Sequence, residues 1–140
     1  MSQIRLSNLV KRFDRTEAVA GISLTVESGQ AVALLGPSGC CKTTTLKCIA
    51  GLEDLTAGEI HLDGRLFAGR NVSLPPEKRA IGMVFQSYAL WPHMTVFGNV
   101  AYPLEVRGCH RVEVRDKVRA TLDLVGLSGF DERLPAQLSG

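Results

Sequence analysis

The stretch that decides the fold runs over residues 31–52 and reads AVALLGPSGCCKTTTLKCIAGL. Its first five residues are apolar and predict a short buried strand, which is followed by a turn of glycine, proline and serine. From Lys42 the pattern predicts a helix that ends at Gly51. Three apolar residues are expected on one face of that helix: Leu46, Ile49 and Ala50. A strand that leads through a glycine loop into a helix is typical of phosphate binding, because backbone N–H groups of the loop and of the helix's first turn converge on the anion.

The loop departs at one position from the phosphate-binding pattern G-x-x-x-x-G-K-[ST]. The first glycine is Gly36 and the lysine is Lys42, but Cys41 stands where the second glycine belongs. Glycine serves there because the backbone approaches the anion closely or takes a positive φ, and another residue in the left-handed region costs about 1–2 kcal/mol. The sequence therefore predicts nucleotide binding that is weakened rather than abolished. The alternative interpretation of the stretch is a helix-capping turn with an exposed lysine.

The composition is that of an ordinary globular protein. The 140 residues are 45% hydrophobic and carry a net charge of +2 without a polybasic run, so nothing in the charge pattern points to nucleic acid. The longest apolar runs are about five residues, far short of the roughly 20 that cross a bilayer. The start of the chain also lacks the charged segment and apolar segment of a signal peptide. These features predict a cytoplasmic protein.

Alternating patterns predict strands before and after the central stretch. Five further strands are expected, at residues 3–9, 19–27, 59–62, 65–67 and 81–85. Asp63-Gly64 is a strong signal for a two-residue hairpin turn. The segment 74–79 carries two prolines and three charges and is expected to be a surface loop.

Helical patterns dominate after Gln86. Thr95 is a candidate N-cap for a helix that runs towards Val106 and that an internal glycine and proline would shorten or kink. The best amphipathic helix is expected over residues 111–125, with Gly126 as its cap. Its predicted apolar face consists of Val114, Val118, Leu122 and Val125. The fold class is therefore α/β, with an antiparallel section at the front and a helical segment at the back.

Three further segments follow the loop in order: MVFQSYAL at 83–90, WPHMTV at 91–96, and Leu138-Ser139-Gly140. With the loop, they resemble the ATP-binding subunits of ABC transporters, of the bacterial importer type related to the maltose, polyamine and iron(III) systems. The resemblance extends over essentially the whole chain. It implies a P-loop NTPase core with an antiparallel β section at 1–86, a helical subdomain at 87–140, and a fold that is incomplete at the C-terminus. A different P-loop protein, such as a kinase or GTPase, would not explain the Gln86 segment or the Leu-Ser-Gly ending.

The resemblance implies ATP and Mg²⁺ as cofactors and assigns roles to single residues. Phe13 falls where the family places an aromatic residue that stacks on adenine, although a plain core aromatic is the alternative. Thr43 and the Q-loop residue Gln86 would contact Mg²⁺, and in the signature motif Ser139 and Gly140 would contact the ATP of the opposite subunit. The implied nucleotide-binding residues are Phe13, Gly36, Pro37, Ser38, Gly39, Cys40, Cys41, Lys42, Thr43, Thr44 and Gln86.

The resemblance also implies partners and a location. Residues Tyr88–Val96 would receive the membrane subunit at the inner face of the cell membrane, two ATPase subunits would pair as a homodimer or pseudo-dimer, and ATP hydrolysis would drive solute uptake. In the family, the Walker B aspartate, the catalytic glutamate and the switch histidine come after the signature motif. A chain that stops at Gly140 is therefore expected to be inactive alone and to expose an unpaired apolar strand edge. The alternative function is that of a truncated, non-catalytic fragment that binds nucleotide weakly.

Overall fold

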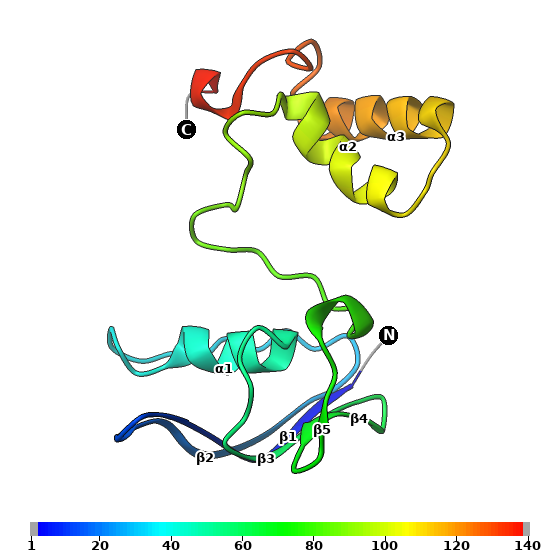
Figure 1. The fold of residues 1–140 in the computed structure, drawn as a ribbon. Coiled ribbons are helices and arrows are strands. Elements are labelled where there is room, and N and C mark those ends of the chain that lie inside the picture. Colours follow the sequence, from blue (N-terminus) through cyan, green and yellow to red (C-terminus); the bar gives the residue numbers. More distant parts are fainter. Residues whose placement is uncertain (1–2, 139–140) are drawn as a thin grey trace. The chain divides into compact units, whose positions relative to one another are not determined.

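The computed structural model describes residues 3–138, which divide into two compact units, 3–83 and 84–138 (Figure 1). The boundary expected from the sequence lies three residues later, after Gln86. Among the described residues, the first unit holds the β-strands and one α-helix, and the second holds two α-helices. Each unit has its own hydrophobic core.

The first unit is built on a five-stranded antiparallel sheet in the order β2-β1-β3-β4-β5. The strands are β1 Ile4–Phe13, β2 Thr16–Val26, β3 Ala57–Leu62, β4 Arg65–Gly69 and β5 Val72–Ser73. Asp63 and Gly64 join β3 to β4 with φ angles of 50° and 76°. Two consecutive positive φ angles are what a type I′ hairpin turn requires, so the predicted hairpin is confirmed.

Helix α1, Lys42–Ala50, ends at Gly51 as predicted but turns a different face to the sheet. Its buried residues are Thr45, Cys48 and Ala50, whereas Leu46 is 48% exposed, so the predicted apolar face is wrong at Leu46. Thr45 tolerates burial because its hydroxyl donates to the Cys41 carbonyl at 3.1 Å. Burial raises the pKa of the Cys48 thiol, which favours the neutral form in the core. The core of this unit consists of Leu6, Leu9, Val19, Cys48, Ile60, Phe67 and Ala68.

The segment 74–79 is a surface loop only in part. A short 3-10 helix covers Pro76–Lys78, but Arg79 is 1% exposed. Its Nε donates to the Leu74 carbonyl at 2.6 Å, and one terminal nitrogen donates to the carbonyls of Cys48 and Ile49 at 2.8 and 2.9 Å. The predicted surface position is therefore wrong for Arg79, because the last carbonyls of α1 supply the acceptors that a buried guanidinium needs.

Two of the predicted strands do not form. Residues 31–35 and 81–85 have no regular secondary structure and pair with no strand among residues 3–138. Leu35 is 90% exposed and Val84 is 91% exposed. A continuous apolar run becomes a strand when neighbouring strands take its backbone hydrogen bonds and cover both faces, and neither run has such neighbours here. The sequence led us to expect an exposed apolar strand edge; the two segments do expose apolar side chains, but they form no strand.

The second unit packs α2, Val96–Val106, against α3, Arg111–Leu124. The Thr95 hydroxyl accepts the N–H of Gly98 at 3.1 Å, which confirms the predicted N-cap. Helix α3 buries three of the four predicted apolar residues, but Val125 lies after its end and is 60% exposed. The core of this unit consists of Val96, Ala101, Val114, Val118 and Leu122.

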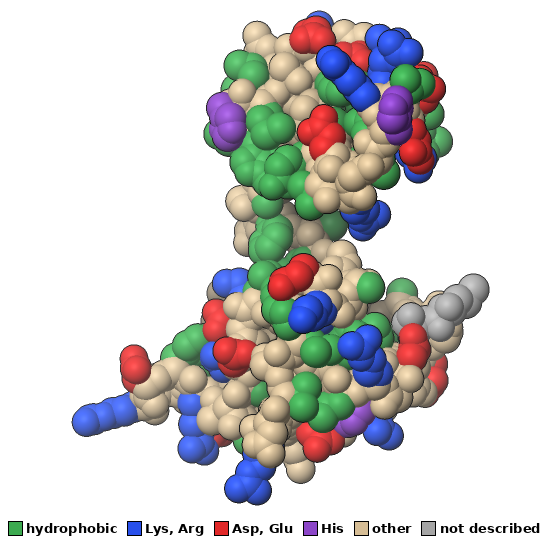
Figure 2. Space-filling model, turned by 45° about the vertical axis from the view of Figure 1, so that its right-hand side comes forward, with side chains coloured by type: hydrophobic (Ala, Val, Ile, Leu, Met, Phe, Trp, Pro, Cys, Tyr) green, Lys and Arg blue, Asp and Glu red, His purple; other side chains and the backbone are tan. Residues whose placement is uncertain are grey.

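Hydrophobic side chains reach the surface of both units, among dispersed charged residues (Figure 2). The most exposed of them are Leu35, Val84, Leu124 and Tyr88. Within the part of the chain that the structure describes, no helix has both the length and the apolar character needed to span a membrane.

Candidate functional site

The loop from Gly36 to Cys41 has positive φ angles at three positions, Gly36, Gly39 and Cys41. Gly39 has a φ of 83°, and Cys41 has a φ of 63° and a ψ of 21°, so the cysteine lies in the left-handed region that glycine adopts most readily. At Gly36, with a φ of 155°, an added Cβ would lie 2.5 Å from the Cys40 sulfur. The Cys41 Sγ donates to the Gly39 carbonyl at 3.3 Å and packs against the core of the first unit. Cys41 therefore carries backbone strain but has contacts that hold it in place.

The ammonium of Lys42 lies inside this loop. Its Nζ donates to the carbonyls of Gly36 and Pro37 at 2.7 and 2.8 Å, and to the Cys40 sulfur at 3.2 Å. These acceptors place the positive charge beside the start of α1, where the backbone N–H groups also favour an anion. A phosphate oxygen is a stronger acceptor for an ammonium than a carbonyl or thiol, so the same contacts can be exchanged for phosphate contacts.

The first turn of α1 leaves its donors available. It contains no acidic residue, and the side chain of Cys41 does not cap it. A hollow of about 190 Å³ lies over this turn and is lined by Gly39, Cys41, Lys42, Thr43 and Thr44. Thr43 is exposed and Thr44 is half-buried, so the Thr43 hydroxyl is the more accessible oxygen ligand. The structure thus brings together Gly39, Cys41, Lys42 and two hydroxyls, as the sequence predicts for the phosphate end of the site.

Thr45 and Arg79 hold the two ends of α1, and the sequence interpretation missed both. The amide and the hydroxyl of Thr45 donate to the Cys41 carbonyl at 2.9 and 3.1 Å, which fixes the loop to the helix. Arg79 binds the last carbonyls of the helix. A hydroxyl four residues after the N-cap of a helix is a local signal that could have indicated the first contact. Nothing local to Arg79 indicates the second, because its acceptors lie some thirty residues earlier.

Phe13 ends β1 and is 43% exposed. It is followed directly by the turn that joins β1 to β2. The Nζ of Lys11 lies 4.6 Å from the centroid of the Phe13 ring, over its face. Phe13 is therefore a surface aromatic with a cation on one face, and the alternative of a plain core residue does not fit its exposure.

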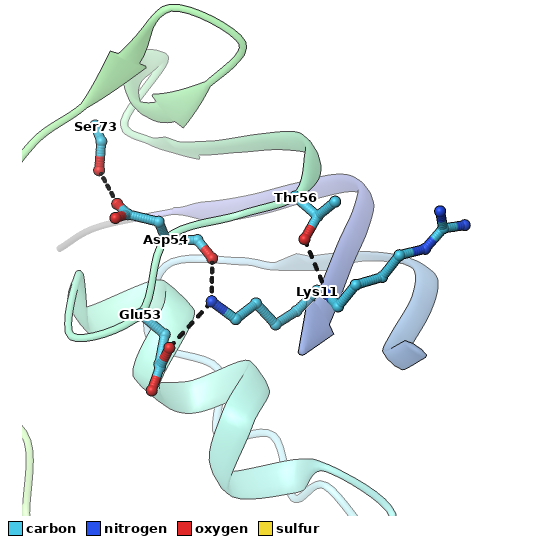
Figure 3. A network of polar contacts seen from close by, with 6 residues as sticks. Lys11, Glu53, Asp54, Thr56 and Ser73 are labelled. Atoms are coloured by element: carbon cyan, nitrogen blue, oxygen red, sulfur yellow. Dashed lines mark hydrogen bonds and ion pairs between the residues drawn. The ribbon is translucent and has the colours of Figure 1, made fainter. Parts of the chain in front are cut away.

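Lys11 belongs to a polar network that joins the sheet to the turn after α1 (Figure 3). Its Nζ is 3.0 Å from the Glu53 carboxylate and donates to the Asp54 carbonyl at 2.9 Å. The Ser73 hydroxyl donates to the Asp54 carboxylate at 2.7 Å, which ties β5 to the same turn. The lysine side chain is 12% exposed, so most of its length is covered.

Gln86 lies in the second unit and is described within that unit alone. It is exposed, in a turn over residues 86–89 that the bond from the Tyr88 N–H to the Phe85 carbonyl closes at 2.9 Å. Tyr88 and Ala89 both have positive φ angles, 59° and 51°. Leu138 packs against the core of the second unit, whereas Ser139 and Gly140 lie outside the described residues.

The segment Tyr88–Val96 is shaped by Asn99 of α2. The Asn99 side chain accepts the N–H of Trp91 at 2.8 Å and donates to the carbonyls of Met94 and Thr95 at 3.1 and 3.0 Å. The Trp91 ring lies 4.4 Å from the ring of Tyr102, so it packs locally. Tyr88 in the same segment is 77% exposed. The apolar loop therefore has one part that faces its own unit and one part that faces outward.

Comparison with known proteins gives one family and a consistent set of relatives. The model of the ABC transporter family matches residues 19–140. The trehalose/maltose import ATP-binding protein MalK of Thermococcus litoralis is 46% identical over the whole chain, which covers 38% of that protein. The Fe(3+) ions import ATP-binding protein FbpC of Brucella abortus is 51% identical over 98% of the chain, again 38% of the relative. The sn-glycerol-3-phosphate import ATP-binding protein UgpC 2 of Agrobacterium fabrum is 44% identical over the whole chain and 36% of its own length.

The fold has a close counterpart among solved structures. The ATP-binding cassette MJ0796, solved as a dimer in a post-hydrolysis state bound to ADP and Pi, superposes with a TM-score of 0.82 at 29% identity. The match covers 97% of the present chain and 63% of that chain. The predicted fold class, a P-loop NTPase core with an antiparallel section and a helical subdomain, is confirmed. The chain spans less than two fifths of the length of the curated relatives named above.

Proposed function

The chain belongs to the ABC transporter family, and on that premise we propose that it is the nucleotide-binding part of an importer's ATP-binding subunit. Residues 1–86 supply the nucleotide-binding core and 87–140 the helical subdomain. The observation that carries the proposal is the placement of the Lys42 ammonium inside the loop and at the start of α1. Binding the β- and γ-phosphates of ATP there uses the lysine charge, the loop N–H groups and the helix dipole together.

The residues available for a magnesium ion fit that ion. Mg²⁺ prefers hard oxygen ligands, and the ligand that the first unit offers is the hydroxyl of Thr43. When bound, the ion would offset negative charge on the outer phosphates. Thr43 is exposed in the first turn of α1, so its hydroxyl is free to turn towards the phosphates that Lys42 holds.

Cys41 reduces the affinity of this site for nucleotide. Its left-handed backbone is already present in the structure, so the conformational strain lowers the stability of the fold before nucleotide binds. What remains for binding is the bulk of the Cβ and the sulfur beside the phosphates. If about 1 kcal/mol of this cost appears in binding, affinity falls about fivefold relative to a glycine at that position.

The proposed partners are a membrane subunit and a second ATPase subunit. The segment Tyr88–Val96 supplies an exposed apolar surface whose backbone is fixed by Asn99, which suits docking of a membrane subunit. The dimeric state of the solved neighbour supports pairing of two subunits. The protein would then work in the cytoplasm, bound to the inner face of the membrane through the transporter. Import of a sugar, iron(III) or a glycerol phosphate is what the relatives' names state of those proteins.

The proposal is tested by titrating the 140-residue chain with MgATP in a calorimeter. The unmodified chain is expected to bind MgATP. Lys42→Ala should bind it at least about tenfold more weakly than the unmodified chain, because a charge-assisted contact is lost. Cys41→Gly should bind it about fivefold more tightly than the unmodified chain. Lys47→Ala removes the same charge from the far end of the same helix and is the matched control. Absence of binding by both the unmodified chain and Cys41→Gly would contradict the proposal.

Cys41 also favours a second function, in which the chain binds nucleotide weakly and does not hydrolyse it. A side chain beside the phosphates disfavours the close approach on which phosphoryl transfer depends. Magnesium-dependent phosphate release is the discriminating measurement. Phosphate release by the unmodified chain that disappears in Lys42→Ala supports the importer ATPase. ATP binding without phosphate release supports the non-catalytic alternative.

A further inference from the structure

The two faces of the Phe13 ring have different surroundings. The Nζ of Lys11 lies over one face, 4.6 Å from the ring centroid, and the side chain as a whole is 43% exposed. A cation at this distance is attracted by the electrons of the ring and occupies that face. The exposed area therefore belongs mainly to the edge and to the opposite face of the ring.

The Lys11 ammonium is held in place by the turn that follows α1. Glu53 and Asp54 follow the end of α1, and the lysine Nζ binds the carboxylate of the first at 3.0 Å and the carbonyl of the second at 2.9 Å (Figure 3). The Glu53 side chain is 28% exposed and the Lys11 side chain 12% exposed, so the pair is largely shielded from solvent. A second bond links the strand to this turn, because the Arg12 N–H donates to the Thr56 hydroxyl at 2.9 Å. Lys11 thus has few alternative positions.

We propose that Lys11 is a positioning residue for the nucleotide base: it fixes the orientation of the Phe13 ring and leaves only the opposite face for stacking. The inference rests on the proposed function of Phe13 as the base-stacking residue. Through Glu53 and Asp54, Lys11 also ties this ring to the helix that carries the phosphate loop. The ring is therefore tied to the turn after the C-terminal end of α1, and the phosphate loop lies at the other end of the same helix.

The chemistry of a purine fits this arrangement. A cation on one face of an aromatic ring withdraws electron density from the other face, and an electron-rich purine stacks well on such a face. Lys11 binds acceptors that follow α1, whereas Lys42 lies in the loop before it, so Lys11 has no role in holding phosphates. Loss of Lys11 should consequently weaken binding through the base and not through the phosphates.

The experiment compares ATP with inorganic tripolyphosphate, which has the phosphates but no base, by calorimetric titration of the full 140-residue chain. Lys11→Met keeps the apolar stem and removes the charge. It is expected to weaken ATP binding threefold or more and to leave tripolyphosphate binding unchanged within twofold. Lys11→Arg retains a cation and is expected to restore ATP binding. Lys78→Met, which removes an exposed lysine outside this network, is the matched control and should change neither affinity.

Two further variants separate positioning from general support of the fold. In a Phe13→Leu background, Lys11→Met should have no additional effect on ATP binding, because the ring it orients is gone. Glu53→Gln keeps the lysine but removes its carboxylate partner, and it should shift ATP affinity in the same direction as Lys11→Met. Equal weakening of ATP and tripolyphosphate, or an undiminished effect in the Phe13→Leu background, would overturn the inference.

The ring contact itself is measured without nucleotide, which keeps the inference distinct from the proposed function. The ring-proton resonances of Phe13, assigned by their loss in Phe13→Leu, should shift in Lys11→Met and not in Lys78→Met. Unshifted resonances overturn the positioning role even where ATP binds. Shifted resonances in a chain that binds tripolyphosphate but not ATP support the contact and refute the base-binding function proposed for Phe13.

Discussion

Replacing Arg79 by methionine tests whether this residue fixes the C-terminal end of α1. Methionine fills a similar volume but has no donor, so the carbonyls of Leu74, Cys48 and Ile49 lose the guanidinium contacts. Cys48 keeps a second donor, the N–H of Gly51 at 3.2 Å, so the main loss falls on Leu74 and Ile49. Two part-buried acceptors at about 1–3 kcal/mol each predict a loss of about 3 kcal/mol in the free energy of unfolding. That loss is a large share of a typical stability of about 5–15 kcal/mol.

Gly51 provides the matching half of a double-mutant cycle. Its φ is 81°, and an added Cβ would lie 2.5 Å from Arg79 Nε, which its hydrogen bonds prevent from moving away. Gly51→Ala therefore costs the left-handed penalty of about 1–2 kcal/mol plus a steric cost. In an Arg79→Met background the steric cost disappears, so the two substitutions should couple by about 1–2 kcal/mol.

Urea unfolding followed by circular dichroism measures these changes, and hydrogen exchange of β1 and β3 assigns them to the first unit. Arg70→Met, at an exposed position in the turn between β4 and β5, is the control and should change stability by less than about 0.5 kcal/mol. A loss below about 1 kcal/mol in Arg79→Met, or additive effects of the two substitutions, would refute the idea that a satisfied buried guanidinium holds the helix end.

Two more predictions concern the second unit. Asn99→Ala removes the side chain that fixes the loop at 91–95, so the single tryptophan, Trp91, should become more accessible to acrylamide, whereas Asn71→Ala should not change its quenching. The hydrogen bond from Lys117 holds the pKa of Glu113 below its ordinary value of 4.5. The contact between Glu113 and Lys117 therefore stabilises the folded state above pH 4.5, and this stabilisation is lost as the pH falls through the folded-state pKa of Glu113. The free energy of unfolding, followed by Trp91 fluorescence from about pH 6 to about pH 3, should depend less on pH in Glu113→Gln than in the unmodified chain. An equal pH dependence in the two proteins would count against a stabilising contact between Glu113 and Lys117.

Local chemistry explains which predictions from sequence were confirmed. The hairpin at Asp63-Gly64, the N-cap at Thr95 and the end of α1 at Gly51 each depend on a residue's own φ preference or on a bond within one turn. The left-handed conformation of Cys41 follows from its place between the glycine loop and the helix. These features need no distant partner, so a pattern of a few residues is enough to predict them.

Apart from Val125, which lies just after the end of α3, the incorrect predictions concern partners that lie far away in the sequence. The runs at 31–35 and 81–85 have the composition of strands, but a strand also needs a neighbour to complete its hydrogen bonds. Leu46 is the more hydrophobic residue, yet the sheet contacts the Thr45 and Cys48 side of α1. Arg79 is buried because two carbonyls of α1 accept hydrogen bonds from its guanidinium. Hydropathy alone would bury Leu46 and expose Thr45 and Arg79, which is the opposite of what the structure shows.

The sequence alone determined that a glycine loop leads into a helix, that a cysteine replaces its second glycine, and that four landmarks stand in the order typical of one family. Local propensity and covalent spacing carry that information. Only the tertiary structure decided that Lys42 lies among the loop carbonyls, that Arg79 closes the far end of the helix, and that Lys11 covers one face of Phe13. Those contacts join residues from different strands, turns and helices, and packing of the sheet against α1 is what brings them within bonding distance.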